Sequence, residues 1–263
     1  MGQSIFIQAL GRPATTVTCA MLGGIYGYIT AKGIGYDQVG LSHEKTLGRW
    51  EIWRIVTAQL SHVELLHLLF NLTTLWSIGD FEASDGFAAK GGVAYYVQMS
   101  TILLLLSGVV TLALYHVLGV LLKREQYLSV TTVGYSAVIF GWMTILAVSG
   151  SASFSVFGFG NIPMYLTPFA SLVLTSIIIP RASFIGHLSG ILVGFLVATE
   201  VLDWLTLWWL ASLLAWAAAF GVYHMVRTGR LDVPWLRMLH QDSGDIETGS
   251  PAVHIVGGVL ERR

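Results

Sequence analysis

Two polar residues lie alone in long apolar stretches of the sequence, and their side chains could carry out nucleophilic chemistry. Ser136 lies in the apolar run 133–142, within residues 126–180, a stretch that contains no Asp, Glu, Lys or Arg. His187 lies in a second uncharged run, 185–194. A single serine of this kind is more often a helix cap or a small residue at a helix contact. A serine and a histidine, each isolated in its own hydrophobic segment, instead predict a nucleophile and its base that meet inside a bilayer.

Serine attack on a peptide carbonyl also requires hydrogen-bond donors for the oxyanion that develops. His67 and Asn71 are four residues apart and therefore share one face of a predicted helix. We expect both to be oxyanion donors, together with the backbone N–H of Ser136.

Glycines accompany both reactive residues. Gly134 precedes the serine by two positions and would allow a close approach of the backbone. Gly186, Gly190 and Gly194 form a ridge of small residues, which predicts tight packing of the His187 helix against the Ser136 helix.

The composition indicates a polytopic membrane protein. Apolar residues make up 54% of the 263 residues and charged residues only 11%. A net charge of −1 excludes a nucleic-acid partner, because no basic field is available to neutralise phosphates. The single cysteine, Cys19, excludes an internal disulfide and a cysteine metal cage.

A metalloprotease is a further alternative, because His62, Glu64 and His67 lie close together in the sequence. Zinc proteases of this kind need the pattern H-E-x-x-H, whose histidines are four apart. Here the histidines are five apart and Glu64 does not follow the first. We therefore predict no metal and no cofactor.

Uncharged runs of 17 to 25 residues predict the membrane spans. Ser61 and Glu64 fit a capping box, which predicts that the second span begins as a helix at residue 61. We expect residues 1–13 to be a short N-terminal tail, 32–56 a loop at the membrane interface, and 227–263 a flexible polar tail. The predicted spans are 14–31, 61–79, 92–119, 131–149, 163–180, 183–201 and 204–226.

The motifs around His67, Ser136 and His187, in this order along the chain, make the sequence resemble the rhomboid intramembrane serine proteases, and especially a plant branch of rhomboid-like proteins. The resemblance covers residues 14–201. The matching positions are Trp53-Arg54 in the first loop, His67 and Asn71 with the upstream His62 on the second span, Gly134 and Ser136 on the fourth, and Gly186, His187, Gly190 and Gly194 on the sixth.

The resemblance implies an all-α membrane protein with a six-helix rhomboid-type core at 14–201. The uncharged run 204–226 predicts an additional transmembrane helix outside that core. The resemblance also implies a Ser136/His187 dyad without a catalytic acid, an oxyanion site at His67, Asn71 and the Ser136 amide, and a water-filled cavity that opens toward the 32–56 loop. We expect His62, Trp53 and Arg54 to support the site, with Arg54 as a hydrogen-bonding hub of the loop. The expected partners are single-pass transmembrane substrates and the lipid bilayer, in an endomembrane or the plasma membrane.

Three departures from the family pattern and one alternative accompany this interpretation. Ala137 replaces a glycine that commonly follows the serine, Glu82 stands one position earlier than the family's acidic residue, and the span 204–226 lies outside the six-helix core. A catalytically inactive relative that binds or escorts membrane proteins is the alternative function. The positive-inside rule would place the 32–56 loop in the cytosol, whereas the resemblance implies an exoplasmic cavity, so the sequence leaves the sidedness open.

Overall fold

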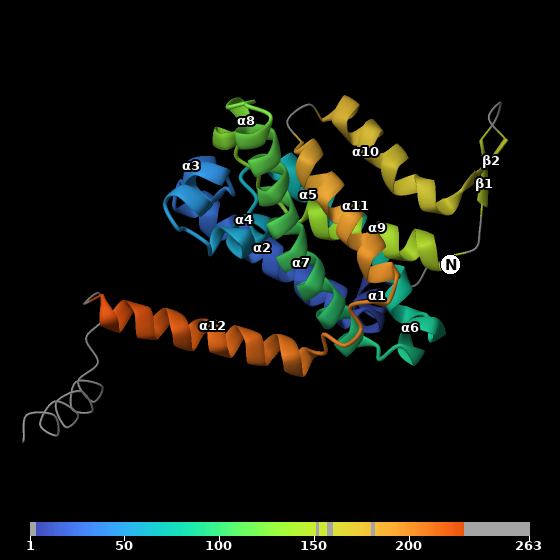
Figure 1. Ribbon diagram of the computed structural model, residues 1–263. Coiled ribbons are helices and arrows are strands. Elements are labelled where there is room, and N and C mark those ends of the chain that lie inside the picture. The colour runs from blue at the N-terminus through green and yellow to red at the C-terminus, as the bar shows by residue number, and fades with distance from the viewer. Residues whose placement is uncertain (1–3, 151–152, 157–159, 180–181, 229–263) are drawn as a thin grey trace, which may run out of the picture. The chain divides into compact units, whose positions relative to one another are not determined.

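The computed structural model describes residues 4–150, 153–156, 160–179 and 182–228. The chain divides into two compact units, residues 1–207 and 208–263, which are described separately (Figure 1). The first unit is a helical bundle with one small hairpin. Its main helices are α2 (Pro13–Ala31), α5 (Leu65–Ile78), α7 (Val93–His116), α9 (Ser136–Ser149), α10 (Thr167–Ile178) and α11 (Phe184–Ala198). These correspond to the six predicted spans of the core.

Shorter helices and turns connect the main helices. Within the predicted N-terminal tail the structure has a helix, α1, which the sequence analysis did not anticipate. The connecting elements are α1 (Ile5–Gly11), α3 (Tyr36–Val39), η1 (Glu44–Gly48), α4 (Arg54–Leu60), η2 (Gly79–Ala83), α6 (Asp85–Ala89), η3 (Val117–Leu121), α8 (Gln126–Ser129) and η4 (Met164–Leu166).

Helix α7 is the central helix of the first unit, and buried side chains such as Ile102 and Leu103 lie along it. Among the described residues, α7 extended by η3 and α12 (Leu207–Arg227) are each long and apolar enough to cross a membrane. Helices α4 and α5 satisfy the same test as a pair, bent by 88° at the break between them, while α9, α10 and α11 are shorter apolar helices. The chain is therefore a polytopic helical membrane protein.

Helix α5 begins later than the capping box predicts. Ser61 does not start the helix, because its hydroxyl donates to the carbonyl of Thr57 and it ends α4. The chain then bends, and α5 begins at Leu65. The prediction of a helix start at residue 61 was wrong because the Ser61 hydroxyl bonds back to the preceding helix, α4, instead of capping α5.

Glu82 caps the N-terminus of α2 with both carboxylate oxygens. Oε1 accepts the N–H of Ala14 at 2.8 Å, and Oε2 accepts the N–H of Thr15 at 2.9 Å. A carboxylate at this position pairs two otherwise unpaired helical N–H groups and complements the helix dipole. Glu82 therefore joins η2 to α2 although it stands one position early in the family pattern.

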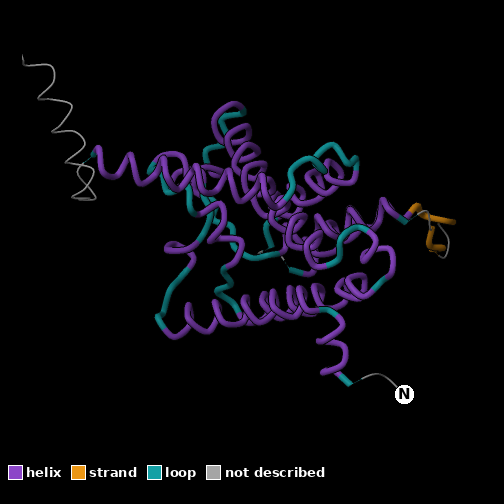
Figure 2. Tube along the Cα trace, turned by 90° about the horizontal axis from the view of Figure 1, so that it is seen from below, coloured by secondary structure: helices purple, strands orange, loops and turns teal. Residues whose placement is uncertain are grey.

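The connection between α9 and α10 contains a short antiparallel hairpin. Strand β1 (Ser153–Val156) pairs with β2 (Gly160–Pro163), with Ser153 opposite Pro163. Figure 2 shows the strands of the described chain confined to this hairpin. The sequence analysis expected a loop here, so the hairpin is an addition within a connecting segment.

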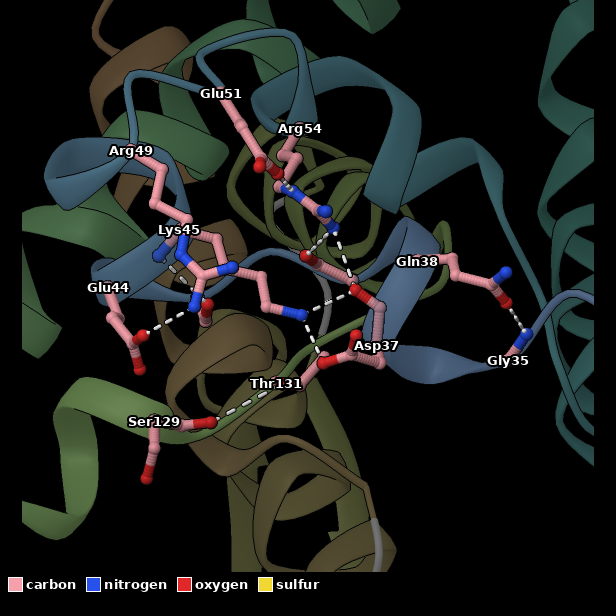
Figure 3. A network of polar contacts seen from close by, with 12 residues as sticks. Gly35, Asp37, Gln38, Glu44, Lys45, Arg49, Glu51, Arg54, Ser129 and Thr131 are labelled. Atoms are coloured by element: carbon pink, nitrogen blue, oxygen red, sulfur yellow. Dashed lines mark hydrogen bonds and ion pairs between the residues drawn. The ribbon is translucent and has the colours of Figure 1, made fainter.

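The 32–56 loop is held by polar contacts around Arg54 (Figure 3). The Arg54 side chain is 8% exposed, forms an ion pair with Glu51, and donates to the Gly40 carbonyl at 2.8 Å. Lys45 binds Asp37 through both its carboxylate and its backbone carbonyl. Together these contacts fold the loop onto itself.

The second unit contains α12, which carries large exposed apolar side chains, among them Trp208, Trp209 and Trp216. A helix that is apolar on several faces is typical of a membrane span. Most of the predicted flexible tail, from residue 229 onward, lies outside the described residues.

Candidate active site

Ser136 is the first residue of α9, and Tyr135 is the N-cap. The first N–H groups of a helix have no partner within the helix. The backbone N–H of Ser136 is therefore free of intrahelical bonding and lies at the positive end of the helix dipole, where negative charge is stabilised.

His187 lies in the first turn of α11, whose N-cap is Ser183. Ser183 Oγ accepts the N–H of Gly186 at 3.0 Å, which fixes the start of the helix. His187 Nε2 lies 2.9 Å from Ser136 Oγ, and the His187 residue is 3% exposed. The structure thus brings together the two isolated polar residues, 51 positions apart, at hydrogen-bonding distance.

The imidazole of His187 is oriented by an aromatic ring. Phe140, four residues after Ser136 on α9, stacks on it with ring centroids 4.4 Å apart and an interplanar angle of 20°. His187 Nδ1 is buried and has no hydrogen-bond partner within the described part of the chain. No carboxylate of the described residues therefore orients this ring, and stacking on Phe140 takes that role.

Helices α9 and α11 pack closely enough for their backbones to touch. A Cβ atom added at Gly190 would lie 2.0 Å from the carbonyl oxygen of Ala137, and one at Gly194 would lie 2.6 Å from that of Gly141. Real Cβ atoms do not approach a carbonyl oxygen so closely, so both positions require glycine. The space at Gly186 is less restricted, because a Cβ added there would lie 3.1 Å from its nearest neighbour, Ser183 Oγ.

Gly134 creates the space for two histidines behind the serine. Its φ of +107° favours glycine, and a Cβ there would lie 2.5 Å from Cε1 of His67. The rings of His67 and His62 meet edge to face, with centroids 5.1 Å apart. His62 is fully buried, and its Nε2 lies 3.5 Å from the backbone nitrogen of Tyr135.

Asn71 lies one turn after His67 on the same face of α5. Its Nδ2 donates to the His67 carbonyl at 2.9 Å, and its Oδ1 is buried without a partner among the described residues. A side-chain amide has a second N–H that remains available. His67, Asn71, Ser136 and His187 all line one cavity of about 270 Å³.

The cavity is mainly apolar apart from these four residues and three hydroxyl-bearing ones, Thr74, Ser171 and Thr175. Its lining residues come from α5, α9, α10 and α11 and from the segment between α10 and α11. Its apolar lining comes from Phe70, Ile139, Phe140, Met143, Leu174 and Ile179. A polar cluster at one point of an apolar cavity is the arrangement that a buried reaction centre requires.

Trp53 and Arg54 do not line this cavity. Arg54 lies in the loop network of Figure 3, and Trp53 is 58% exposed. Within the described ranges, no group of three or more His, Cys, Asp and Glu side chains is arranged to hold a metal ion.

Phe140 is the residue of this site that the sequence analysis missed. The available signal was its spacing, because a residue four positions after the serine lies on the same helical face. An aromatic side chain there is equally typical of helix packing, so the spacing alone could not assign it.

Comparison with known proteins identifies the family. The family model described as the rhomboid domain matches residues 49–204. Rhomboid-like protein 15 of Arabidopsis thaliana is 28% identical over 189 residues, which cover 70% of this chain and 45% of that protein. Rhomboid-type serine protease 2 of Yarrowia lipolytica is 31% identical over 161 residues, covering 60% of this chain and 50% of the relative.

A human relative, rhomboid-related protein 4 of Homo sapiens, is 27% identical over 186 residues, covering 70% of this chain and 56% of its own length. The chain thus spans about half the length of the curated relatives it matches. The domain match covers more than half of the chain and includes every residue that lines the cavity. The protein is therefore a member of the rhomboid family, an integral membrane protein that crosses the bilayer several times.

Proposed function

We propose that this rhomboid protein is an intramembrane serine endopeptidase that cleaves single-pass transmembrane proteins in or near their membrane-spanning helix. The observation that carries the proposal is the 2.9 Å contact between Ser136 Oγ and His187 Nε2 at the wall of the cavity. The serine protease named among the relatives supports it. In this proposal residues 14–201 form the catalytic unit.

The proposed reaction begins with proton transfer from Ser136 Oγ to His187 Nε2 as Oγ bonds to the substrate carbonyl carbon. Nδ1 then carries the other imidazole hydrogen, so His187 becomes an imidazolium. It returns a proton to the leaving nitrogen as the C–N bond breaks and the acyl-enzyme remains. Water adds to the acyl carbon with His187 again as base, which releases the new carboxyl terminus and restores Ser136.

The oxyanion requires donors at each of the two tetrahedral stages. The free backbone N–H of Ser136, the ring of His67 and the second amide N–H of Asn71 are the candidates. Turnover should fall at low pH, because a protonated His187 cannot accept the serine proton.

The substrate must present an unpaired carbonyl to Ser136. In an intact transmembrane helix every interior carbonyl is already bonded within the helix. We therefore expect substrates with glycine, proline or other helix-destabilising residues near the cleavage site.

The first test replaces Ser136 with alanine and measures cleavage of a panel of single-pass reporter proteins in liposomes. We expect Ser136→Ala to abolish cleavage. Ser189→Ala is the matched control, because Ser189 is a buried serine of α11 whose hydroxyl bonds only to the Ile185 carbonyl of its own helix. Equal cleavage by Ser136→Ala and the parent protein would refute the proposal.

Labelling with a fluorophosphonate separates an enzyme from an escort protein. We expect Ser136 to be labelled in the parent and not in His187→Ala, because the imidazole activates the hydroxyl. An unlabelled Ser136, with no cleavage of any reporter, would instead support the inactive, escorting function.

The second test removes the proposed oxyanion donors. Asn71→Ala and His67→Ala should each lower kcat, by up to about 10²–10³-fold, because an oxyanion donor acts on the transition state. KM should change little. Thr73→Ala is the control, since Thr73 is an exposed residue of the same helix whose hydroxyl bonds to the Leu69 carbonyl. Parent-like kcat in the double variant would exclude both residues from the oxyanion site.

A further inference from the structure

Three hydroxyl groups meet beside the dyad, one from each of three segments. They belong to Tyr115 of α7, Thr132 in the segment before α9, and Ser183, the N-cap of α11. Thr132 Oγ1 donates to Ser183 Oγ at 3.0 Å, and the Tyr115 hydroxyl lies 3.4 Å from the same oxygen. The Tyr115 hydroxyl is also hydrogen-bonded to Thr132 Oγ1. Each group thus contacts both others, and we call the three residues the hydroxyl triad.

The Thr132–Ser183 pair lies four residues before the dyad on each of the two segments. Thr132 precedes Ser136 by four residues, and Ser183 precedes His187 by four residues. The Thr132–Ser183 bond and the Ser136–His187 contact therefore join the same two segments with the same separation of 51 residues. Further along the same two segments, the glycine contacts between α9 and α11 follow.

The hydrogen bonds of the hydroxyl triad form a complete set. Tyr115 can donate to Thr132, Thr132 to Ser183, and Ser183 to Tyr115, so that each hydroxyl donates once and accepts at least once. Ser183 Oγ additionally accepts the N–H of Gly186. Bonds in such a ring polarise one another and strengthen cooperatively. Removing one hydroxyl therefore weakens the remaining bonds as well.

The backbone before Ser136 is held by other elements. Leu41 and Thr132 exchange two backbone hydrogen bonds of 2.9 Å, and the N–H of Gly134 donates to the Ala58 carbonyl at 3.0 Å. These bonds fix the segment to the 32–56 loop and to α4, not to α11. The Thr132 side chain is the hydroxyl that reaches α11 from this segment, and Tyr115, which is 1% exposed, holds that junction against α7.

We propose that Tyr115, Thr132 and Ser183 are positioning residues that set the separation of Ser136 Oγ and His187 Nε2. They contact neither the substrate cavity nor the reacting atoms. The inference rests on the proposed function, since it concerns the geometry of the same dyad. It follows from the shared spacing. One turn of α11 joins Ser183 to His187, and the short segment 133–135 joins Thr132 to Ser136. A shift between residues 132 and 183 is therefore transmitted to the nucleophile and the base, and displacements near 1 Å can change rates by about 10²-fold.

The test compares Thr132→Val with Thr132→Ser. Valine keeps the shape of threonine and removes the hydroxyl, whereas serine keeps the hydroxyl. We expect Thr132→Val to lower kcat by about tenfold with KM unchanged, a partial loss because the glycine contacts remain. The rate of fluorophosphonate labelling of Ser136 should fall by the same factor. Thr132→Ser should recover most of both rates.

Matched controls come from α7. Thr111→Val removes a buried hydroxyl that bonds only to the Ser107 carbonyl of the same helix, and Tyr96→Phe removes a buried phenol remote from the hydroxyl triad. Neither should alter kcat. Tyr115→Phe should behave as Thr132→Val does, and the double variant should be no slower than the slower single variant, because the three hydroxyls act as one unit.

Thermal unfolding separates a positioning role from a structural one. If Thr132→Val and Tyr115→Phe lower the Tm and leave kcat and labelling at the parent rates, the hydroxyl triad only stabilises the fold and the inference is overturned. If Thr132→Val does not fold, Tyr115→Phe decides by the same criteria. Cleavage that survives Ser136→Ala would defeat the proposed function itself, whereas an inactive Ser136→Ala beside a fully active, well-folded Thr132→Val would defeat only the positioning role.

Discussion

The contact between α9 and α11 and the folded 32–56 loop are held together by different forces. Between α9 and α11, glycine backbones touch at Gly190 and Gly194, without charged groups. The loop is held by ion pairs, several of them exposed, and by backbone hydrogen bonds such as the one between Leu41 and Thr132. Close packing has no tolerance for added volume, whereas exposed ion pairs contribute little individually and respond to salt.

The difference implies that the α9–α11 contact fixes the distance between Ser136 and His187, whereas the 32–56 loop can adjust its conformation. A peptide bond can be attacked only if the serine and histidine keep their separation. That separation depends on the α9–α11 contact, which lies in the hydrophobic interior. The loop, by contrast, carries exposed charged groups and contributes no residue to the lining of the cavity. We therefore expect substitutions at the α9–α11 contact to have larger effects than substitutions in the 32–56 loop.

The largest effect should come from Gly190→Ala. The added methyl would lie 2.0 Å from the Ala137 carbonyl oxygen, so α9 and α11 must separate by more than 1 Å to accept it. We expect kcat to fall by at least about 10²-fold, together with a lower Tm. Ala170→Val on the exposed side of α10 adds more volume and should change neither quantity. Parent-like cleavage by Gly190→Ala would mean that the dyad tolerates movement of its helices.

Much of this contact was predictable from the sequence, and its partners were not. Uncharged runs located the helices, and the isolated Ser136 and His187 suggested that two of them meet. The stacking of Phe140, the bond between Thr132 and Ser183, and the cap that Glu82 places on α2 join residues that are far apart or chemically ordinary. Serine, threonine and phenylalanine occur throughout membrane helices, so no local sequence pattern distinguishes Phe140, Thr132 and Ser183 from other residues of the same types. The bend before α5 also escaped prediction, because the Ser61 hydroxyl donates to the Thr57 carbonyl of α4 instead of capping the next helix.

An intermediate effect should come from Arg54→Met. This change leaves the Gly40 carbonyl and the Glu51 carboxylate without their buried partner. Removing one member of such a network should lower the free energy of unfolding by about 2–3 kcal/mol, because the remaining groups stay desolvated. Turnover well below the Tm should stay near the parent value, since Arg54 does not line the cavity.

The matched control in the loop is Arg49→Met, which breaks the exposed pair with Glu44. An exposed pair of this kind contributes at most about 1 kcal/mol. Chemical denaturation of both variants in the same detergent measures the difference. Equal stability of the Arg54 and Arg49 variants would show that the loop has no organising centre.

The smallest effect should be the acid sensitivity of the loop at His43, which lies outside the membrane-spanning helices. Its Nε2 is 3.0 Å from Nδ1 of His116, at the end of α7, and the two rings are stacked. Burial of the imidazole, and secondarily the charge of His116, lowers the pKa of His43 below its usual value of 6.5. The unfolded chain therefore takes up this proton first as the pH falls. The stability contributed by neutral His43 is complete above pH 6.5 and is lost as the pH falls through the lowered pKa.

The measurement is the change in Tm between about pH 7.5 and about pH 5.5. Other groups of the chain also contribute to this change, so the informative quantity is the part of it that His43→Gln removes. We expect His43→Gln to reduce the acid-induced loss by no more than about 2 °C, and His224→Gln, at an exposed position of α12, to leave it unchanged. An equal loss in both variants would mean that the contact between the loop and α7 does not sense pH, and the two regions would then differ in packing alone.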